Sequence, residues 1–234
     1  MEQQSKIIDI PDDWYTVLKD YIESPHFTAI GKEVGKQRKE DKVFPKREET
    51  FRAFKLTPFK DVKIVIIGMD PYPNEHNGEP VACGLSFATR DIEKLSPSSR
   101  QIFNCLKNTL YATDLLFPQD MDIKTWAEQG VLMLNASLTV RAGEAGSHLK
   151  LWEQFTTAVI KALDRHKAGV IFCLWGKDAQ KFGVHIGEDN KCLLAPHPVS
   201  ASYNGGTWEC DHFFKINNYL NKRNEKTIKW MQLP

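Results

Sequence analysis

Four short apolar runs in the sequence each end at a polar residue that is suited to chemistry. The runs and the residues after them are 63–68 before Met69 and Asp70, 131–134 before Asn135, 170–174 before Trp175-Gly176-Lys177, and 192–195 before Pro196-His197. Short, fully apolar runs of this kind predict the buried strands of a parallel sheet. The carboxyl ends of parallel strands share one edge, where open α/β sheets bind ligands. We therefore expect a carboxylate, an amide and an imidazole to converge at that edge.

Helical patterns lie around these runs. They cover residues 12–22, part of the charge-dense stretch 32–49, residues 100–110 after a capping loop at 96–99, a helix closed by residues 126–130, residues 150–166 and residues 211–223. The charge-dense stretch is typical of a solvated helix and loop. The alternation predicts an α/β fold in a single domain spanning residues 1–234. Its central four-stranded, largely parallel sheet is flanked by helices, with the site at the carboxyl edge of the strands.

Composition limits the class of protein. A length of 234 residues suits one such domain, and a net charge of +1 argues against a chain coated in positive charge. A local groove for DNA remains compatible with that charge. No apolar stretch approaches the roughly 20 residues that span a bilayer, and the first residues do not follow the pattern of an export signal. The five cysteines are scattered without zinc-site spacing. We expect an intracellular protein without disulfides, a bound metal or membrane contact.

Each polar tip also has an ordinary structural interpretation when it is considered alone. Asp70 could cap a turn, and Asn135 could satisfy backbone groups in a loop. His197 could bond locally, and Phe87 could be a core residue. The functional interpretations are a fixed carboxylate, an amide that reads a nucleobase edge, a neutral imidazole donor and a stacking ring. A phosphatase-type nucleophile is disfavoured because Tyr72 stands where a second Asp is needed.

Several segments form an ordered series along the chain. They are residues 62–72 with the motif GMDPY, residues 84–87 (GLSF), residues 126–135 running on through 138–143 to Ser147-His148, residues 174–176 with 179–180, His197-Pro198 and Trp230-Met231. This series resembles the classical uracil-DNA glycosylases, family 1, over nearly the whole chain. The GMDPY segment is similar to that family's water-activating motif GQDPY, and residues 126–135 are very close to its uracil-binding strand.

The resemblance implies a DNA repair enzyme that flips uracil out of DNA and hydrolyses its N-glycosidic bond, without a metal or other cofactor. It implies two catalytic residues. Asp70 would orient the water and stabilise the cationic sugar, and neutral His197 would donate to uracil O2 as negative charge develops.

The resemblance also implies a substrate-binding set of four residues. Phe87 would stack on the uracil ring, and the Asn135 amide would read O4 and N3–H. Tyr72 would stand against C5, where the methyl group of thymine would clash. Met69 would lie beside them, where the family has a glutamine.

DNA, single- or double-stranded and containing uracil, is the partner that the resemblance implies. Ser98, His148, Ser200, Ala201 and Ser202 would contact it, chiefly at phosphates. A proteinaceous glycosylase inhibitor is a further class of partner. We expect a monomer in the cytoplasm, as for a bacterial or phage protein, or in the nucleus of a eukaryote.

The chain departs from the family pattern at three places. Met69 replaces the glutamine of the first motif, and residues 73–84 form a longer stretch than the family's. Ala201 stands where the family's wedge loop offers a leucine that fills the space left by the flipped base. Alanine is too small for this, and Tyr203 is a candidate substitute. These departures predict that uracil in single-stranded DNA is preferred over uracil in duplex.

Two alternatives share the fold. A non-catalytic DNA-binding or replication-accessory protein would not need Asp70, Tyr72, Phe87, Asn135 and His197 together. A glycosylase with altered base choice is suggested by the changes in the first motif, although Tyr72 argues against bulky 5-substituents. A plain α/β hydrolase or phosphatase is disfavoured because the sequence has neither GxSxG nor a P-loop.

Overall fold

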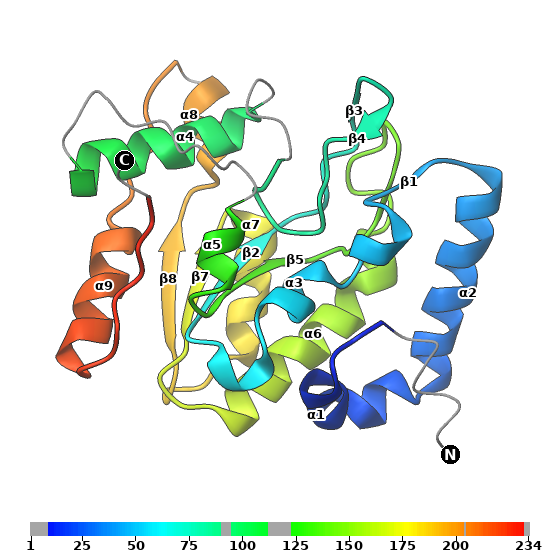
Figure 1. The fold of residues 1–234 in the computed structure, drawn as a ribbon, viewed down its shortest axis with the longest axis horizontal. Coiled ribbons are helices and arrows are strands. Elements are labelled where there is room, and N and C mark those ends of the chain that lie inside the picture. Colours follow the sequence, from blue (N-terminus) through cyan, green and yellow to red (C-terminus); the bar gives the residue numbers. More distant parts are fainter. Residues whose placement is uncertain (1–8, 90–94, 112–122, 204, 232–234) are drawn as a thin grey trace.

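Four parallel strands form the central sheet of the computed structural model, which describes residues 9–89, 95–111, 123–203 and 205–231 (Figure 1). The strands are β2 (Ile64–Gly68), β5 (Val131–Asn135), β7 (Ile171–Trp175) and β8 (Lys191–Ala195), in the order β5-β2-β7-β8. Every pair is parallel, and each strand begins and ends within one residue of its predicted bounds. The predicted fold class is confirmed. The ends of the predicted domain, 1–8 and 232–234, lie outside the described residues.

The register of the sheet aligns the tips of its strands. Gly68 is opposite Asn135 at the ends of β2 and β5. Trp175 is opposite Ala195 at the ends of β7 and β8. The polar residues that follow these four strands therefore leave the sheet at one level.

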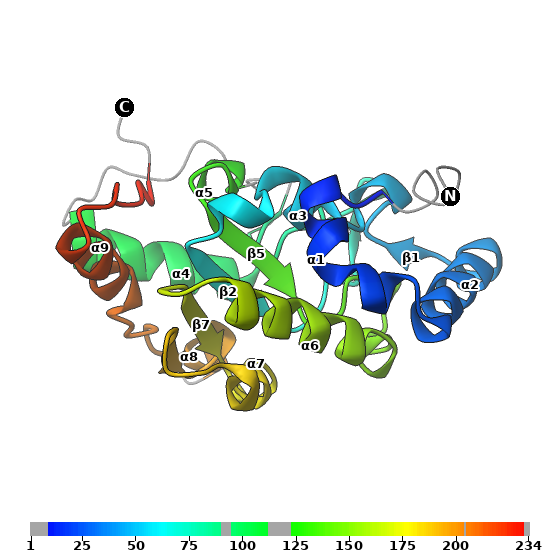
Figure 2. The same cartoon turned by 90° about the horizontal axis from the view of Figure 1, so that it is seen from below.

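Helices cover both faces of the sheet. Figure 2 shows α3 (Arg52–Leu56) and α5 (Lys124–Ala127) on one face and α6 (Leu149–His166) and α7 (Lys177–Gln180) on the other. The outer helices are α1 (Asp12–Ile22) and α2 (Pro25–Glu40), which pack near α6, and α9 (His212–Lys222), which lies beside β8. Within the described residues, no helix is both long and apolar enough to cross a bilayer.

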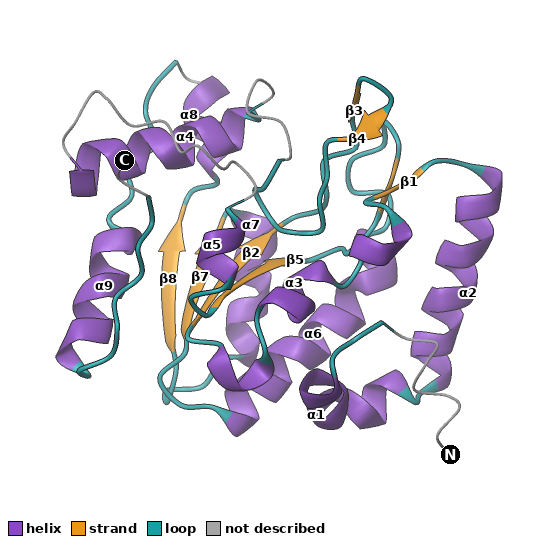
Figure 3. Cartoon of the chain, in the orientation of Figure 1, coloured by secondary structure: helices purple, strands orange, loops and turns teal. Residues whose placement is uncertain are grey.

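Shorter elements gather above the carboxyl edge, at the top of Figure 3. They are α4 (Pro97–Leu106), α8 (Pro198–Tyr203), the hairpin of β3 (Glu75–His76) and β4 (Glu79–Pro80), and the antiparallel pair of β1 (Val43–Phe44) and β6 (Val140–Arg141). One-turn helices at Arg47–Glu49, Phe59–Asp61 and Lys181–His185 and a π turn at Lys107–Tyr111 complete the list.

Two predicted helices have different bounds from those expected. The helix predicted at 100–110 begins at Pro97, because Ser96 caps it by accepting the Ser99 N–H and proline is favoured at the first helical position. It ends as an α-helix at Leu106. The helix expected within 32–49 begins at Pro25 for the same reason, with Ser24 as its cap. Residues 43–45 within that stretch are buried, because they include β1, whereas a solvated helix and loop were expected.

Candidate active site

The tips of β2 and β5 bring predicted site residues together. Met69 and Asp70 follow Gly68, which lies beside Asn135. A Cβ atom built on Gly68 would lie 2.6 Å from Asn135 Oδ1 and 3.5 Å from Phe87 Cε2. The amide and the aromatic ring therefore both lie against the backbone of Gly68. Asn135 itself is buried.

Phe87 adopts a backbone conformation that non-glycine residues rarely adopt, with φ at 59°. Its ring centroid lies 5.4 Å from that of Trp175 and 5.8 Å from that of His197. Its carbonyl oxygen accepts a hydrogen bond of 2.7 Å from Ser99 Oγ. Strained backbone persists only where its surroundings hold it, and it is frequent at binding sites.

His197 is held as a specific tautomer. The Val199 N–H donates to Nδ1 at 3.2 Å, so the neutral ring carries its proton on Nε2. Burial lowers the pKa of His197, and the charge of Asp178 opposes part of that shift. The ring packs closely on Gly176, where an added Cβ would lie 2.8 Å from His197 Cβ. His197 is therefore a neutral Nε2–H donor at pH 7.

Asp70 accepts a hydrogen bond of 2.5 Å from the backbone N–H of Gly146 on Oδ2. Burial raises the pKa of the carboxyl, the Gly146 bond lowers it, and the charge of Asp178 raises it further. The charge of Asp178 thus raises the pKa of both Asp70 and His197. The donor on Gly146 comes from the loop before α6, and no local sequence signal indicated it.

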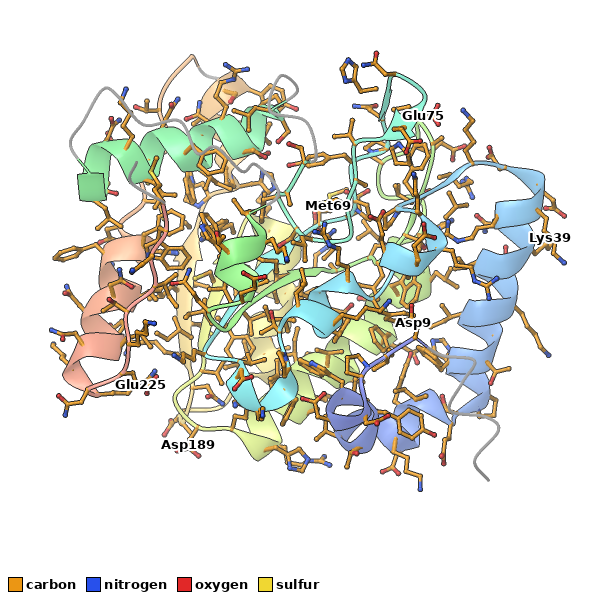
Figure 4. The ribbon with its side chains drawn as sticks, viewed as in Figure 1. Asp9, Lys39, Met69, Glu75, Asp189 and Glu225 are labelled. Atoms are coloured by element: carbon orange, nitrogen blue, oxygen red, sulfur yellow. The ribbon has the colours of Figure 1, made fainter. Side chains whose placement is uncertain are left out.

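Tyr72 and Met69 flank Asp70. The Tyr72 hydroxyl lies 2.7 Å from Ser96 Oγ and 3.1 Å from Ser99 Oγ. Burial raises the pKa of this phenol, so it is neutral at physiological pH. In Figure 4, Met69 lies between α4 and the hairpin that carries Glu75. A Cβ atom built on Gly146 would lie 3.5 Å from Met69 Cε.

The predicted DNA-contacting residues divide between two helices that pack together, α4 and α8. Ser98 is buried in the first turn of α4. On α8, Ser200 Oγ donates to the His197 carbonyl at 2.6 Å, and Ser202 Oγ accepts from Gln101 Nε2 at 3.2 Å. Ala201 is half-buried against the core. Both helices border the carboxyl edge, and their contacts with DNA stay predictions.

His148 lies apart from this group. Its side chain is 2 % exposed, with Nδ1 at 2.8 Å from Thr139 Oγ1 and Nε2 at 2.6 Å from Gln37 Oε1. The Gln37 amide nitrogen donates to Glu33, so its oxygen faces His148 and accepts from Nε2. Both ring nitrogens are therefore used inside the protein, and the ring is not placed to hold a phosphate. Its hydrogen-bonding neighbours come from α2 and β5–β6, which sequence patterns could not pair with it.

The longer stretch after the first motif is the β3–β4 hairpin. Asn77 and Gly78 have φ values of 52° and 80°, which is the pattern of a two-residue hairpin turn. The Asn-Gly pair was a readable signal that the sequence prediction missed. Two ion pairs, Lys42 with Glu75 and Lys46 with Glu79, tie the hairpin to the chain around β1.

The structure also contains a cavity of about 520 Å³ beyond β8. It lies between Cys105, Leu194, Trp208 and Glu209. None of the predicted site residues lines it, so it is separate from the site described above. Within the described residues, no group of three or more metal-ligating side chains is placed to hold a metal ion.

Comparison with known proteins identifies the family. A sequence profile described as the Uracil DNA glycosylase superfamily matches residues 54–221. This chain belongs to that superfamily. The uracil-DNA glycosylase of Aliivibrio salmonicida (strain LFI1238) is 40% identical over 223 residues, which cover 94% of this chain and 97% of that protein.

Solved structures agree with the glycosylase family. The crystal structure of mimivirus uracil-DNA glycosylase superposes with a TM-score of 0.85 at 26% identity, covering 95% of this chain and 87% of that one. The Y322L variant of mimivirus UNG in complex with UGI superposes with a TM-score of 0.86 at 26% identity, covering 96% and 90%. The likeness extends over the whole sheet and its flanking helices.

Proposed function

We propose that this chain is a uracil-DNA glycosylase, which hydrolyses the N-glycosidic bond of uracil in DNA and leaves an abasic site. The observation that carries the proposal is that an amide, an aromatic ring and an imidazole lie together at one edge of the sheet. The Asn135 amide and the Phe87 ring meet over Gly68, and the neutral His197 ring contacts Phe87. A planar ring with mixed donors and acceptors is the kind of ligand that such a set recognises.

Base recognition follows from the groups at the tips. A uracil flipped out of the helix would stack on Phe87, at an unstacking cost of a few kcal/mol. The Asn135 amide offers one acceptor and two donors, which match N3–H and O4 of uracil. Cytosine reverses that pattern at its amino group. Tyr72 would close the space beside C5 and exclude the thymine methyl.

Bond cleavage creates a cationic sugar and a uracil anion. Asp70 would stabilise the sugar and orient the attacking water, as carboxylates do in glycoside hydrolysis. His197 would donate its Nε2–H to uracil O2 as the negative charge builds. One preorganised donor of this kind lowers the barrier by roughly 3–4 kcal/mol. The depressed pKa of His197 supports a neutral donor rather than a proton transfer.

Further expectations concern partners and location. Uracil-containing DNA would lie across α4 and α8, where hydroxyls, backbone amides and a helix N-terminus can hold phosphates. A protein inhibitor is proposed as a second partner, supported by the mimivirus UNG variant in complex with UGI. A cytoplasmic location and a monomeric state stay predictions.

The test compares oligonucleotides that contain uracil, thymine or 5-hydroxymethyluracil. We expect abasic sites only with uracil. Asp70→Asn and His197→Leu should each lower single-turnover cleavage by about 100-fold or more, while DNA binding survives, because each removes a group that acts in the transition state. Binding is measured by fluorescence anisotropy with the same oligonucleotides. Cleavage at the wild-type rate by either variant would overturn the role assigned to that residue. Failure of the wild-type chain to release uracil would overturn the proposed function.

A further inference from the structure

Behind the predicted uracil-contacting residues lies a triangle of three hydroxyls. The Tyr72 hydroxyl, Ser96 Oγ and Ser99 Oγ are 2.7, 3.1 and 2.9 Å apart in pairs. Ser96 is also the cap of α4, accepting the Ser99 N–H at 3.0 Å. The triangle therefore connects the first motif to the N-terminus of a helix of ten residues.

The hydrogen bonds of this triangle lead to one acceptor outside it, the Phe87 carbonyl. The Ser99 hydroxyl donates to the Phe87 carbonyl at 2.7 Å, and a carbonyl can only accept. Ser99 Oγ must then accept from Tyr72 or from Ser96. In each such arrangement the Ser99 hydroxyl stands between the other two hydroxyls and the Phe87 carbonyl. Ser99 is the residue that joins the Tyr72 side of the network to the Phe87 side.

Phe87 and Tyr72 both have constrained positions, and Ser99 contributes a hydrogen bond to each of them. Phe87 has a positive φ, which costs about 1–3 kcal/mol unless its surroundings maintain it. Tyr72 sits between two prolines, so its backbone is stiff. Its ring is held by packing against a small buried cluster and by the two serine hydroxyls that meet its own. Ser99 is 1 % exposed, so water does not replace its hydrogen bonds.

We propose that Ser99 is a positioning residue that sets base selectivity, by fixing the Tyr72 ring that excludes 5-substituents relative to the Phe87 ring that stacks on the base. The inference rests on the proposed function and goes beyond it, because Ser99 is buried and is not one of the residues predicted to contact the base or the DNA. Loss of its hydroxyl lets the two rings move apart, so the space at C5 opens.

The experiment measures kcat/KM on single-stranded oligonucleotides that carry uracil or 5-fluorouracil. The two leaving groups differ in reactivity, but that difference is common to all variants and cancels when each ratio is divided by the wild-type ratio. For Ser99→Ala we expect the preference for uracil to fall by about fivefold, the factor that corresponds to one ordinary hydrogen bond. Ser99→Thr retains the hydroxyl and should keep the wild-type ratio.

A matched control separates selectivity from stability. Thr57 is fully buried, and its hydroxyl donates to the Ala127 carbonyl at 3.1 Å, at the opposite end of the sheet. Thr57→Val should lower the thermal midpoint without changing the ratio. A double-mutant cycle with Tyr72→Phe adds a coupling test. In that background Ser99→Ala should change the ratio less, because the partner hydroxyl is already absent.

The outcomes are distinct. An unchanged ratio in Ser99→Ala, or an equal loss in Thr57→Val, overturns the inference and leaves the proposed function standing. If Ser99→Ala does not fold, Tyr72→Phe removes the other side of the same bond, and an unchanged ratio there overturns the inference. A wild-type chain that cleaves neither base overturns the proposed function itself.

Discussion

At the scale of single residues, the absence of a side chain at Gly68 decides where the amide of Asn135 can lie. An added Cβ would be 2.6 Å from Asn135 Oδ1 and 2.9 Å from Ser86 Cβ, closer than Cβ atoms come to other heavy atoms in folded proteins. Gly68 does not have a positive φ. Glycine is needed here because a side chain would not fit, rather than because of the backbone conformation. The last residue of β2 thus forms part of the site.

Gly68→Ala should therefore damage catalysis more than folding. The Asn135 amide must move, and a displacement of about 1 Å at a reacting group can cost about 100-fold in rate. Overpacking of this kind costs about 1–3 kcal/mol in stability. Single-turnover cleavage of a uracil oligonucleotide and urea unfolding measure the two effects. Gly31→Ala is the control, since nothing lies within 4 Å of a Cβ there. Wild-type cleavage by Gly68→Ala would contradict the argument.

At the scale of elements, the orientation of α8 sets which of its side chains are exposed. Gln101 on α4 donates to Ser202 Oγ and to the Gly206 carbonyl, and it accepts the Trp208 N–H. These bonds fix the orientation of α8, with Ala201 half-buried against the core and Tyr203 82% exposed. Tyr203 is thus the large side chain that α8 presents to solvent. It is suited to stack in the space left by a flipped base.

The prediction for this element concerns the strandedness of the substrate. We expect the wild-type chain to cleave uracil in single-stranded DNA faster than in duplex, because Ala201 is too small to fill the helix. Tyr203→Ala should widen that preference by about tenfold, the value of one lost base–aromatic stack. Matched single- and double-stranded oligonucleotides measure it. Val184→Ala, at an equally exposed apolar position, is the control. A wild-type preference for duplex, or equal losses on both substrates, would refute the prediction.

At the scale of the whole molecule, the buried His148 and His212 and the half-buried His197 link folding to pH. Burial lowers the pKa of His148, His197 and His212 in the folded chain. The Nδ1 atoms of His197 and His212 accept hydrogen bonds, from Val199 N–H and from Trp175 Nε1–H, and protonation would break them. The neutral forms are therefore part of the native hydrogen bonding.

The sign of the pH dependence follows from linkage. Below about pH 6.5 the histidines of the unfolded chain bind protons, whereas those of the folded chain stay neutral. The free energy of unfolding should therefore decrease as the pH is lowered. Each histidine contributes up to about 1.4 kcal/mol per pH unit until its folded-state pKa is reached. The raised pKa of Asp70 acts in the opposite direction. Urea unfolding at about pH 7.5 and 5.5 tests this, and equal stability at both values would exclude the linkage.

Residue patterns alone were enough to predict the four strands, the polar residues at their carboxyl ends and most of the helices. These features depend on local periodicity, capping residues and the rule that parallel strands end at one edge. Asn135 as a strand tip was readable for that reason, and a cap was predicted within 96–99, although the helix begins three residues earlier than expected. The turn at Asn77-Gly78 was equally readable and was missed.

Which side chains contact each other could be learned only from the folded chain. The sequence predicted His148 as a loop residue that contacts DNA, yet its ring bonds to Thr139 and Gln37 inside the protein. Ser99 has no distinguishing local pattern, yet it joins Tyr72 to Phe87. Sequence periodicity specifies which face of an element is buried. The contacts between residues far apart in the chain depend instead on how the faces pack, and only the folded chain determines that.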